Sequence, residues 1–198
     1  MIDRFFAEVF AKKIKERLDK NKLKKIEREL FLIEGMSIKL SIEFFEKLHL
    51  QLKQIMNDSE SFELQILDEI CQIQSSKDKA VITILDKSLI NELLYDFGDD
   101  NIRRILLTIM KNELVITDIL KQTHVSKTSG YRIIEDLIIK GLIIETKMIL
   151  SKSKKISKFK CIFEEIVFRL NNERILIEIV IPKKDLEKSS IMKILWQN

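Results

Sequence analysis

Hydrophobic residues recur at helical spacing through the first third of the chain. One stripe has members three and four positions apart, on a single helical face: Ile2, Phe5, Phe6, Val9, Phe10, Ile14 and Leu18. A second stripe consists of Leu23, Ile26, Leu30 and Ile33, and Gly35 is placed to end that helix in a left-handed cap. The pattern therefore predicts two amphipathic helices before residue 36.

The segment from Ser37 to Met56 is predicted to form one long helix. Ile38, Phe45 and Leu52 repeat every seven residues, which is typical of a bundle helix or a dimer seam. The intermediate positions of this seam hold Ser41, Leu48 and Ile55, and the neighbouring positions hold Ile42, His49 and Met56. Asp58 or Ser59 is expected to cap a fourth helix carrying Phe62, Ile66, Leu67, Ile70 and Ile73.

The polar run Gln74–Lys79 is the best candidate for a domain boundary. We therefore expect residues 1–79 to form a helical domain that mediates dimerisation or holds an effector. Residues 80–198 form the second domain in this division. That domain opens with the β-branched run AVITIL, which predicts a short strand, and Asp86 is expected to cap a helix that stops at Gly98.

Two short helices joined by a turn are predicted after a helix from Asp100 to about Met110. The first is expected to begin at Thr117, and the second is capped by Ser126. The turn between them holds Thr123, His124 and Val125. The inward face of the second helix holds Gly130, Ile133, Ile134, Leu137 and Ile138, and Gly141 stands in the position of its C-terminal cap.

After Gly141 the hydrophobic pattern changes to period two, which indicates strands. A strand from Leu142 to Leu150, a basic tip over residues 151–158 and a returning strand together predict a hairpin, or wing. A second hairpin is expected around the turn at residues 171–173. The final stretch, Asp185–Trp196, indicates a short amphipathic helix or a partner-binding tail.

The segment VITDILKQTHVSKTSGYRIIEDLIIKGLIIE and the wing after it resemble the winged helix-turn-helix regulators, particularly archaeal proteins related to the ArsR and MarR families. The resemblance covers residues 99 to 160 and extends in outline to the C-terminal strands. His124 stands where this family usually has Gly, and His tolerates the left-handed conformation better than most residues. The expected fold is mainly α with a small antiparallel β component: an N-terminal helical domain and a winged helix-turn-helix domain with an extra hairpin and a tail helix.

Charge is nearly balanced overall but not locally. The chain has 35 basic and 31 acidic residues, a net charge of +4, which does not by itself indicate a nucleic-acid partner. Residues 121–160 contain ten basic and three acidic residues, a balance of +7, so the rest of the chain carries −3. Clustered cations supply most of the non-specific affinity for phosphates, and this cluster coincides with the predicted second helix and wing.

Double-stranded DNA is therefore the expected partner. The residues expected to contact it are Ser126, Lys127, Thr128, Ser129, Tyr131 and Arg132 on the second helix, and Lys152, Lys154, Lys155 and Lys158 on the wing. Arg132 has the reach for a bidentate contact to guanine. Two other roles are open to this side chain: it could hold a phosphate, or it could pair with Glu135 or Asp136.

The sequence gives little support to an enzyme or a metal protein. It has no Gly-rich phosphate loop and no paired His or Cys spacing, and Cys71 and Cys161 each lie in an apolar pattern typical of buried thiols. No catalytic residue, metal site or cofactor is expected. No window approaches the roughly 18 apolar residues of a membrane span, and the N-terminus lacks a signal-peptide core, so a cytoplasmic protein without membrane contact is expected.

The expected function is that of a DNA-binding transcriptional regulator acting as a homodimer. The target sequence, the effector and the sign of regulation stay open. The alternative is a winged-helix subunit that binds protein or RNA within a larger assembly. The two differ in whether the second helix of the predicted motif is open, or is covered by the N-terminal helices.

Overall fold

Among the N-terminal helices, side-chain caps are formed by Asp19 and Ser37, whereas Asp58, one of the two residues expected to cap a helix, forms no capping hydrogen bond. The computed structural model describes residues 2–151, 154–172 and 174–195. Its first helices are α1 (Asp3–Arg17), α2 (Lys20–Glu34), α3 (Ile38–Ile42), α4 (Phe45–Ile55) and α5 (Ser59–Ile70). The Asp19 carboxylate accepts hydrogen bonds from the first turn of α2, and Gly35 ends that helix at φ 65°. The first two predicted helices and the Gly35 cap are thus confirmed.

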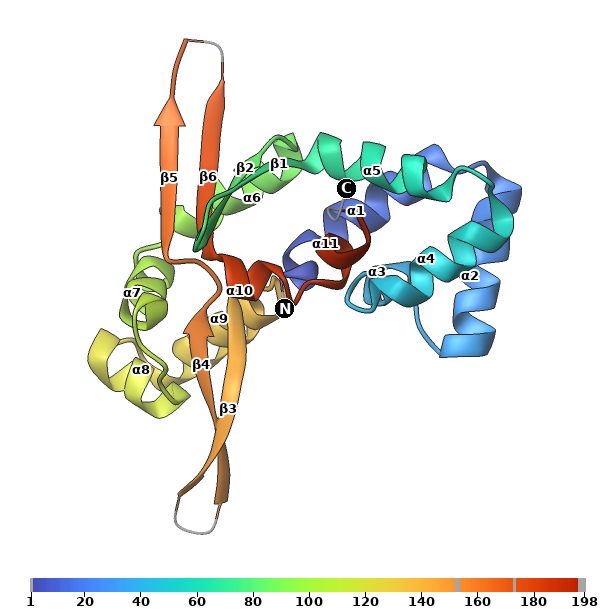
Figure 1. Ribbon diagram of the computed structural model, residues 1–198. Coiled ribbons are helices and arrows are strands. Elements are labelled where there is room, and N and C mark those ends of the chain that lie inside the picture. Colours follow the sequence, from blue (N-terminus) through green and yellow to red (C-terminus); the bar gives the residue numbers. More distant parts are fainter. Residues whose placement is uncertain (1, 152–153, 173, 196–198) are drawn as a thin grey trace.

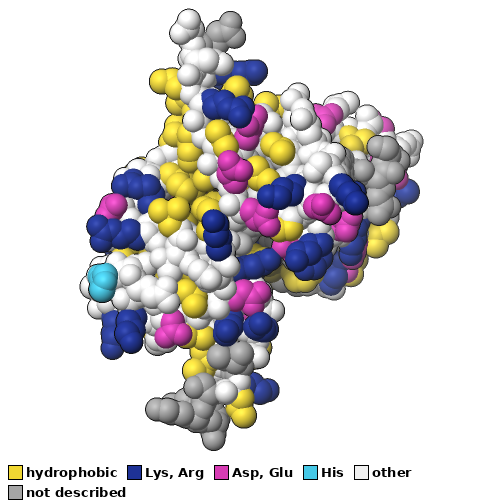
Figure 2. All heavy atoms as spheres, turned by 60° about the vertical axis from the view of Figure 1, so that its left-hand side comes forward, with side chains coloured by type: hydrophobic (Ala, Val, Ile, Leu, Met, Phe, Trp, Pro, Cys, Tyr) yellow, Lys and Arg dark blue, Asp and Glu magenta, His cyan; other side chains and the backbone are white. Residues whose placement is uncertain are grey.

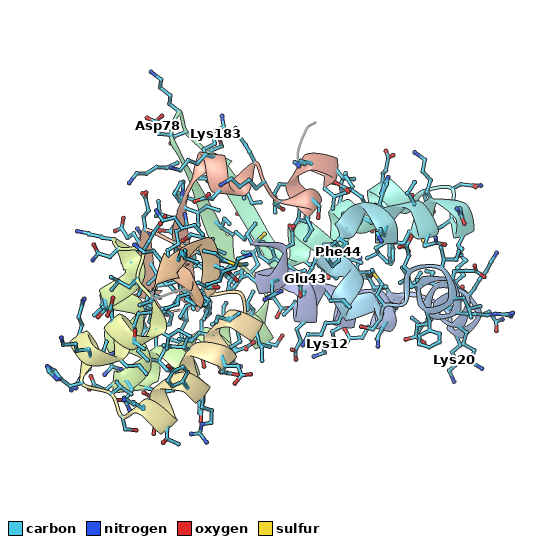
Figure 3. The ribbon with its side chains drawn as sticks, turned by 90° about the horizontal axis from the view of Figure 1, so that it is seen from below. Lys12, Lys20, Glu43, Phe44, Asp78 and Lys183 are labelled. Atoms are coloured by element: carbon cyan, nitrogen blue, oxygen red, sulfur yellow. The ribbon has the colours of Figure 1, made fainter. Side chains whose placement is uncertain are left out.

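The prediction of one helix from Ser37 to Met56 is wrong. Phe44 has φ −126° and ψ 55°, outside the helical region, and this residue separates α3 from α4 (Figure 3). The backbone N–H of Phe45 donates to Oγ of Ser190, 3.1 Å away, so a hydroxyl from the far end of the chain caps α4. The break turns Phe45 into the core, where it meets Phe10 edge to face at 5.4 Å, and leaves Phe44 exposed.

The heptad positions of this segment are buried inside the chain. Ile38, Phe45, Leu48 and Leu52 all lie in the hydrophobic core, together with Phe6, Phe10 and Ile14 of α1. Of the two readings of the pattern, the bundle helix is therefore the correct one, because these side chains are not available to a second copy.

An antiparallel sheet follows the helices. Its strands are β1 (Cys71–Ser75), β2 (Lys79–Ile84), β5 (Glu165–Leu170) and β6 (Ile175–Pro182), in the order β1-β2-β6-β5. On one face the register pairs Ile82 with Ile179 and Ile84 with Ile177, and all four side chains are buried. The helix α6 (Lys87–Gly98), capped by Asp86 as predicted, packs on the sheet through Phe97, whose ring lies 5.2 Å from that of Phe168.

The polar run Gln74–Lys79, predicted as a domain boundary, contains the turn of a hairpin. β1 and β2 pair on either side of it, and Ile73, which was expected in a helix, lies in β1. The backbone N–H of Lys183 donates to the carbonyl oxygen of Asp78, 2.9 Å away (Figure 3). A division at 79/80 therefore falls within a paired sheet, and one continuous core contains residues from both sides of it.

The remaining elements lie on the side of the molecule away from α2, α3 and α4 (Figure 1). They are α7 (Asp100–Met110), α8 (Ile116–Thr123), α9 (Lys127–Ile139), β3 (Ile143–Ser151) and β4 (Lys154–Cys161). The predicted bounds of α7 are confirmed, with Asp99 as its cap. β3 and β4 form a separate two-stranded sheet, and the two hairpins, β3–β4 and β5–β6, project in opposite directions. The fold is thus mainly helical with a smaller antiparallel β component.

The C-terminal segment is part of the core. It forms α10 (Lys183–Leu186) and α11 (Ser190–Leu195), and Ile191, Met192 and Leu195 are buried. The Asp3 carboxylate accepts a hydrogen bond from the backbone N–H of Ser190 at 2.9 Å and another from the Ser189 hydroxyl. The described part of this segment is therefore tied to the start of α1, and it does not offer the apolar face of an open partner-binding tail.

A buried carboxyl lies between α4 and α5. Oε2 of Glu63 is 2.7 Å from Nδ1 of His49, while Oε1 has no hydrogen-bond partner among the described residues. Burial raises the pKa of Glu63 to about 7, against the opposing effect of His49. The folded protein therefore retains a proton on this group at pH values where the unfolded chain has lost it.

This carboxyl makes stability depend on pH. Since the folded pKa lies above the unfolded one, the free energy of unfolding should fall by about 3 kcal/mol as pH rises from 4.5 to 7. Denaturant unfolding of Glu63→Gln should show a flatter profile over this range, because the amide cannot ionise. Asp68→Asn, at an exposed site on the same helix, is the matched control. Identical profiles for Glu63→Gln and the wild type would contradict the account.

Candidate nucleic-acid interface

The turn between α8 and α9 has the conformation that the sequence predicts. The Thr123 hydroxyl donates back to the carbonyl oxygen of Ile119, 2.9 Å away, which closes the last turn of α8. His124 then adopts φ 56° and ψ 20°, the left-handed conformation that was predicted for this turn position. Oγ of Ser126 accepts a hydrogen bond from the backbone N–H of Ser129 at 3.3 Å and so caps α9.

Gly130 lies at the contact between the two helices. A Cβ atom at this position would lie 2.1 Å from Cδ2 of Leu120, so a larger residue here would require the Leu120 side chain to move. Ile134 and Leu137 continue the buried face of α9 and pack in the same core. The N-terminal half of α9 is thereby held across α8 with its other side facing solvent.

The predicted contact residues of α9 all lie on that open side. Ser126, Lys127, Thr128, Ser129, Tyr131 and Arg132 are exposed. On the face shown in Figure 2, Lys and Arg side chains gather along the edge of the molecule where α7–α9 lie. No N-terminal helix covers these six residues.

Ion pairs divide the basic cluster into two groups. Lys140, Lys147 and Lys160 are neutralised within the chain, by Asp96 at 2.7 Å, Glu113 at 3.1 Å and Asp185 at 2.7 Å. In the part of the chain that the structure describes, no ion pair is formed by Lys121, Lys127, Arg132, Lys155 or Lys158. The cations without an internal partner thus include four of the predicted contact residues.

Arg132 is free of the neighbouring acids. Asp136 lies 3.1 Å from the Lys140 ammonium and pairs with it, one helical turn further along α9. The Arg132 guanidinium forms no ion pair with Glu135 or Asp136 in the described structure. It is therefore available to an external anion.

The predicted wing residues are placed only in part. Lys152 lies outside the described residues, and of Lys154 the structure describes only the backbone, as the first residue of β4. Lys155 is exposed opposite Leu150, and Lys158 is half-buried opposite Lys147. The hairpin on which these residues lie extends away from the body of the molecule (Figure 1).

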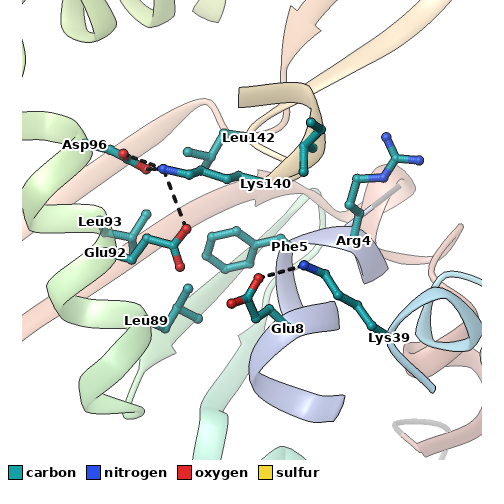
Figure 4. Close-up of a pocket in the computed structure, with 11 residues that line it drawn as sticks. Arg4, Phe5, Glu8, Lys39, Leu89, Glu92, Leu93, Asp96, Lys140 and Leu142 are labelled. Atoms are coloured by element: carbon teal, nitrogen blue, oxygen red, sulfur yellow. Dashed lines mark hydrogen bonds and ion pairs between the residues drawn. The ribbon is translucent and has the colours of Figure 1, made fainter. Parts of the chain in front are cut away.

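The C-terminal end of α9 is held by a buried ion cluster. Nζ of Lys140 lies 2.7 and 2.9 Å from the two carboxylate oxygens of Asp96, whose side chain is 2% exposed, and 3.7 Å from Glu92 (Figure 4). Burial raises the pKa of Asp96, although its hydrogen bond to Lys140 opposes that shift. The cavity beside this cluster has a volume of only about 40 Å³, so the junction is closely packed.

Lys140 was predicted to belong to the basic cluster that faces a ligand. In the structure its ammonium group instead forms an ion pair with Asp96 inside the fold. Asp96 carried a usable signal, since it lies on the same buried face of α6 as Leu89 and Leu93. An acid in an apolar stripe indicates a buried cation partner.

Next to this cluster, α9 ends against α1. Gly141 has φ 74°, and a Cβ atom there would lie 2.6 Å from the backbone nitrogen of Phe5. The Arg4 guanidinium also donates to the carbonyl oxygen of Ile138, 3.3 Å away. The last turn of α9 therefore rests directly on the first turns of α1.

Comparison of the chain with models of protein families, with curated proteins and with solved structures found no match. Among the described residues no three His, Cys, Asp or Glu side chains are grouped so that they could hold a metal ion. None of the described helices has the length and apolar character needed to cross a membrane. Function is therefore inferred from the geometry of α8, α9 and the β3–β4 hairpin.

Proposed function

We propose that the chain is a DNA-binding transcriptional regulator. In this proposal α7, α8, α9 and the β3–β4 hairpin form a winged helix-turn-helix domain. The N-terminal half of α9 enters the major groove, where Arg132 and Lys127 contact base edges and the hydroxyl side chains hold phosphates. The hairpin lies over the neighbouring sugar-phosphate backbone.

The observation that carries this proposal is the location of the cations that lack an internal partner. The fold neutralises Lys140, Lys147 and Lys160 with its own carboxylates, but leaves Lys127 and Arg132 unpaired on the open side of α9. Cations concentrated on one surface without internal partners favour a polyanionic ligand, since binding releases the counterions of the phosphates.

Duplex DNA is favoured over the alternative ligands. The alternative subunit, which binds protein or RNA, would be expected to bury the outer face of α9 or to read single-stranded bases. That face is open in the isolated chain, and its residues are cationic and hydroxyl-bearing, not predominantly apolar. A helix also fits the major groove of B-form DNA but not the deep, narrow major groove of A-form RNA.

The test uses Arg132→Ala on a duplex selected from random DNA and on a scrambled duplex. Loss of a base-reading Arg should weaken binding to the selected duplex by about 1 to 3 kcal/mol and to the scrambled duplex by far less. Arg28→Ala, at an exposed site on α2, is the matched control and should leave both affinities unchanged. Thermal unfolding of both variants checks that the fold is intact.

The other outcomes assign different roles. An equal loss on both duplexes would place Arg132 on the phosphate backbone. No loss on either would remove this side of α9 from the interface. Failure to select any DNA, with binding to RNA or to a protein instead, would favour the alternative subunit.

We also propose that the N-terminal helices mediate homodimerisation, because symmetric DNA-binding proteins usually act as dimers. Because the heptad positions Ile38, Phe45 and Leu52 are buried, two copies of the chain would have to meet through another surface. Phe31 and Leu32 of α2, Leu40 of α3 and the adjoining Phe44 are exposed large hydrophobic side chains. Apolar side chains of this size, grouped on neighbouring elements, are typical of interaction surfaces.

Replacing Phe31 and Leu32 together by Ser should therefore convert a dimer to a monomer, as measured by sedimentation equilibrium of the full chain. Leu107→Ser, which removes an exposed Leu from α7, is the matched control and should leave the mass unchanged. A wild-type chain that sediments as a monomer, or a double variant that remains dimeric, would contradict the assignment.

A further inference from the structure

The β3–β4 hairpin exposes two large apolar side chains. Met148 is 65% exposed and Leu150 is 75% exposed. They are alternate residues of β3, so they point to the same side of the hairpin. The hairpin projects from the body of the molecule (Figure 1), and hydrophobic and basic side chains lie near one another on its described part (Figure 2). Neither Met148 nor Leu150 belongs to the hydrophobic core of the described residues.

Polar and cationic residues flank this apolar pair. The register places Ser157 opposite Met148 and Lys155 opposite Leu150, and directly paired residues of an antiparallel hairpin share a side. The surrounding stretch from Thr146 to Lys160 contains six Lys and no acidic residue, although two of these, Lys147 and Lys160, pair with carboxylates elsewhere in the fold. The hairpin thus combines apolar side chains with charge that suits a ligand with phosphates on either side of an apolar surface.

The DNA minor groove has this chemistry. Its walls are lined by phosphates, and the base pairs at its floor expose π-faces when a base step opens. Side chains such as Leu and Met that enter the groove partly unstack a base step, and the duplex then bends toward the major groove. Polar side chains alone would contact the backbone but could not replace the lost stacking.

The hairpin is placed to reach a groove next to the one that α9 would occupy. β3 begins directly after the last turn of α9 and Gly141, and β4 is anchored beside α7 through the Leu114–Phe159 bridge. The two elements are therefore fixed relative to each other. We infer that Met148 and Leu150 form an apolar wedge that enters the minor groove and bends the DNA, an inference that rests on the proposed function.

A cationic hairpin with two apolar side chains also has the composition of a segment that binds an anionic lipid surface. DNA is favoured over a lipid surface because cations without an ion-pair partner in the described structure are found on α9 as well as on the hairpin. On the open side of α9, Lys127 and Arg132 lie among hydroxyl side chains, and most of the described residues there are polar. Lipid binding is an outcome that the experiment distinguishes.

The experiment compares the full chain with the double variant Met148→Ser/Leu150→Ser, which keeps every charge. Leu170→Ser is the matched control, because Leu170 is 83% exposed on the β5–β6 hairpin, which projects in the opposite direction. The probes are two short end-labelled duplexes of the same sequence, one intact and one with a central T·T mismatch. Affinity, its salt dependence and the end-to-end energy transfer are measured for each, with thermal unfolding as a check on folding.

The wild type should increase energy transfer on the intact duplex and should bind the mismatched duplex more tightly, because part of the unstacking cost is already met there. The double variant should bind the intact duplex about tenfold more weakly, lose both the bend and the preference, and keep the salt slope. Leu170→Ser should behave as the wild type.

A double variant that bends DNA and prefers the mismatch as the wild type does would overturn the wedge but leave the proposed function intact. A wild type that binds neither duplex would overturn the proposed function and the wedge with it. If the wild type then bound vesicles of phosphatidylserine and phosphatidylcholine, and the double variant did not, the apolar pair would be assigned to a membrane surface.

Discussion

The buried contact between Lys140 and Asp96 fixes the C-terminal end of α9, and the adjoining Gly141 places that end on α1. Asp96 is almost fully buried in this pair, whereas Lys140 keeps part of its side chain exposed. The contact therefore lies between an exposed ion pair, which contributes about 0 to 1 kcal/mol, and a fully buried one, which costs about 3 to 5 kcal/mol to break. Among the described residues, the ion pairs Lys13–Asp86 and Lys160–Asp185 are shielded to a similar degree. A glycine that admits no Cβ atom next to the Phe5 backbone adds a steric limit to the electrostatic one.

The two ends of α9 thus have different roles. Its C-terminal half contacts β3, and Ile134 and Leu137 continue into the common core; the adjoining Lys140 pairs with Asp96 of α6, and Gly141 lies against α1. Its N-terminal half begins at the Ser126 cap, packs against α8 at Gly130 and presents its polar residues to solvent. For the DNA-binding role proposed above, this arrangement would set the orientation of the candidate contact residues before the ligand arrives, so that less conformational entropy would be lost on binding.

α1 links this element to the rest of the molecule. Its first residue, Asp3, accepts the hydrogen bond that caps α11. Phe6 and Phe10 of the same helix are buried in the core, and its first turn lies in contact with Gly141 at the end of α9. The N-terminal helices and α9 therefore share one packed core, and no flexible linker separates them. A displacement of α1 requires Gly141 to move as well, because the backbones of these two segments are in direct contact.

The sequence was most informative where structure is local. Gly35, Ser126 and the left-handed His124 each act on neighbouring residues, so caps and turns could be predicted from the chain alone. The helix break at Phe44 could not, because the cap of the next helix comes from Ser190, 145 residues after Phe45.

Two further features depend on distant partners in the same way. β1 was missed because Ile73 fits a helical stripe as well as a strand, and pairing with β2 decides between them. Among the candidate contact residues, local pattern found the open side of α9. It did not separate the cations that pair inside the fold, such as Lys140, from those that do not.

Hydrogen exchange of the full chain, with and without a selected DNA duplex, would show which elements contact DNA. Slower amide exchange is expected at the N-terminal end of α9 and along β3 and β4, with no change in α2. Slower exchange confined to α2 and α3, with the start of α9 unaffected, would contradict this expectation.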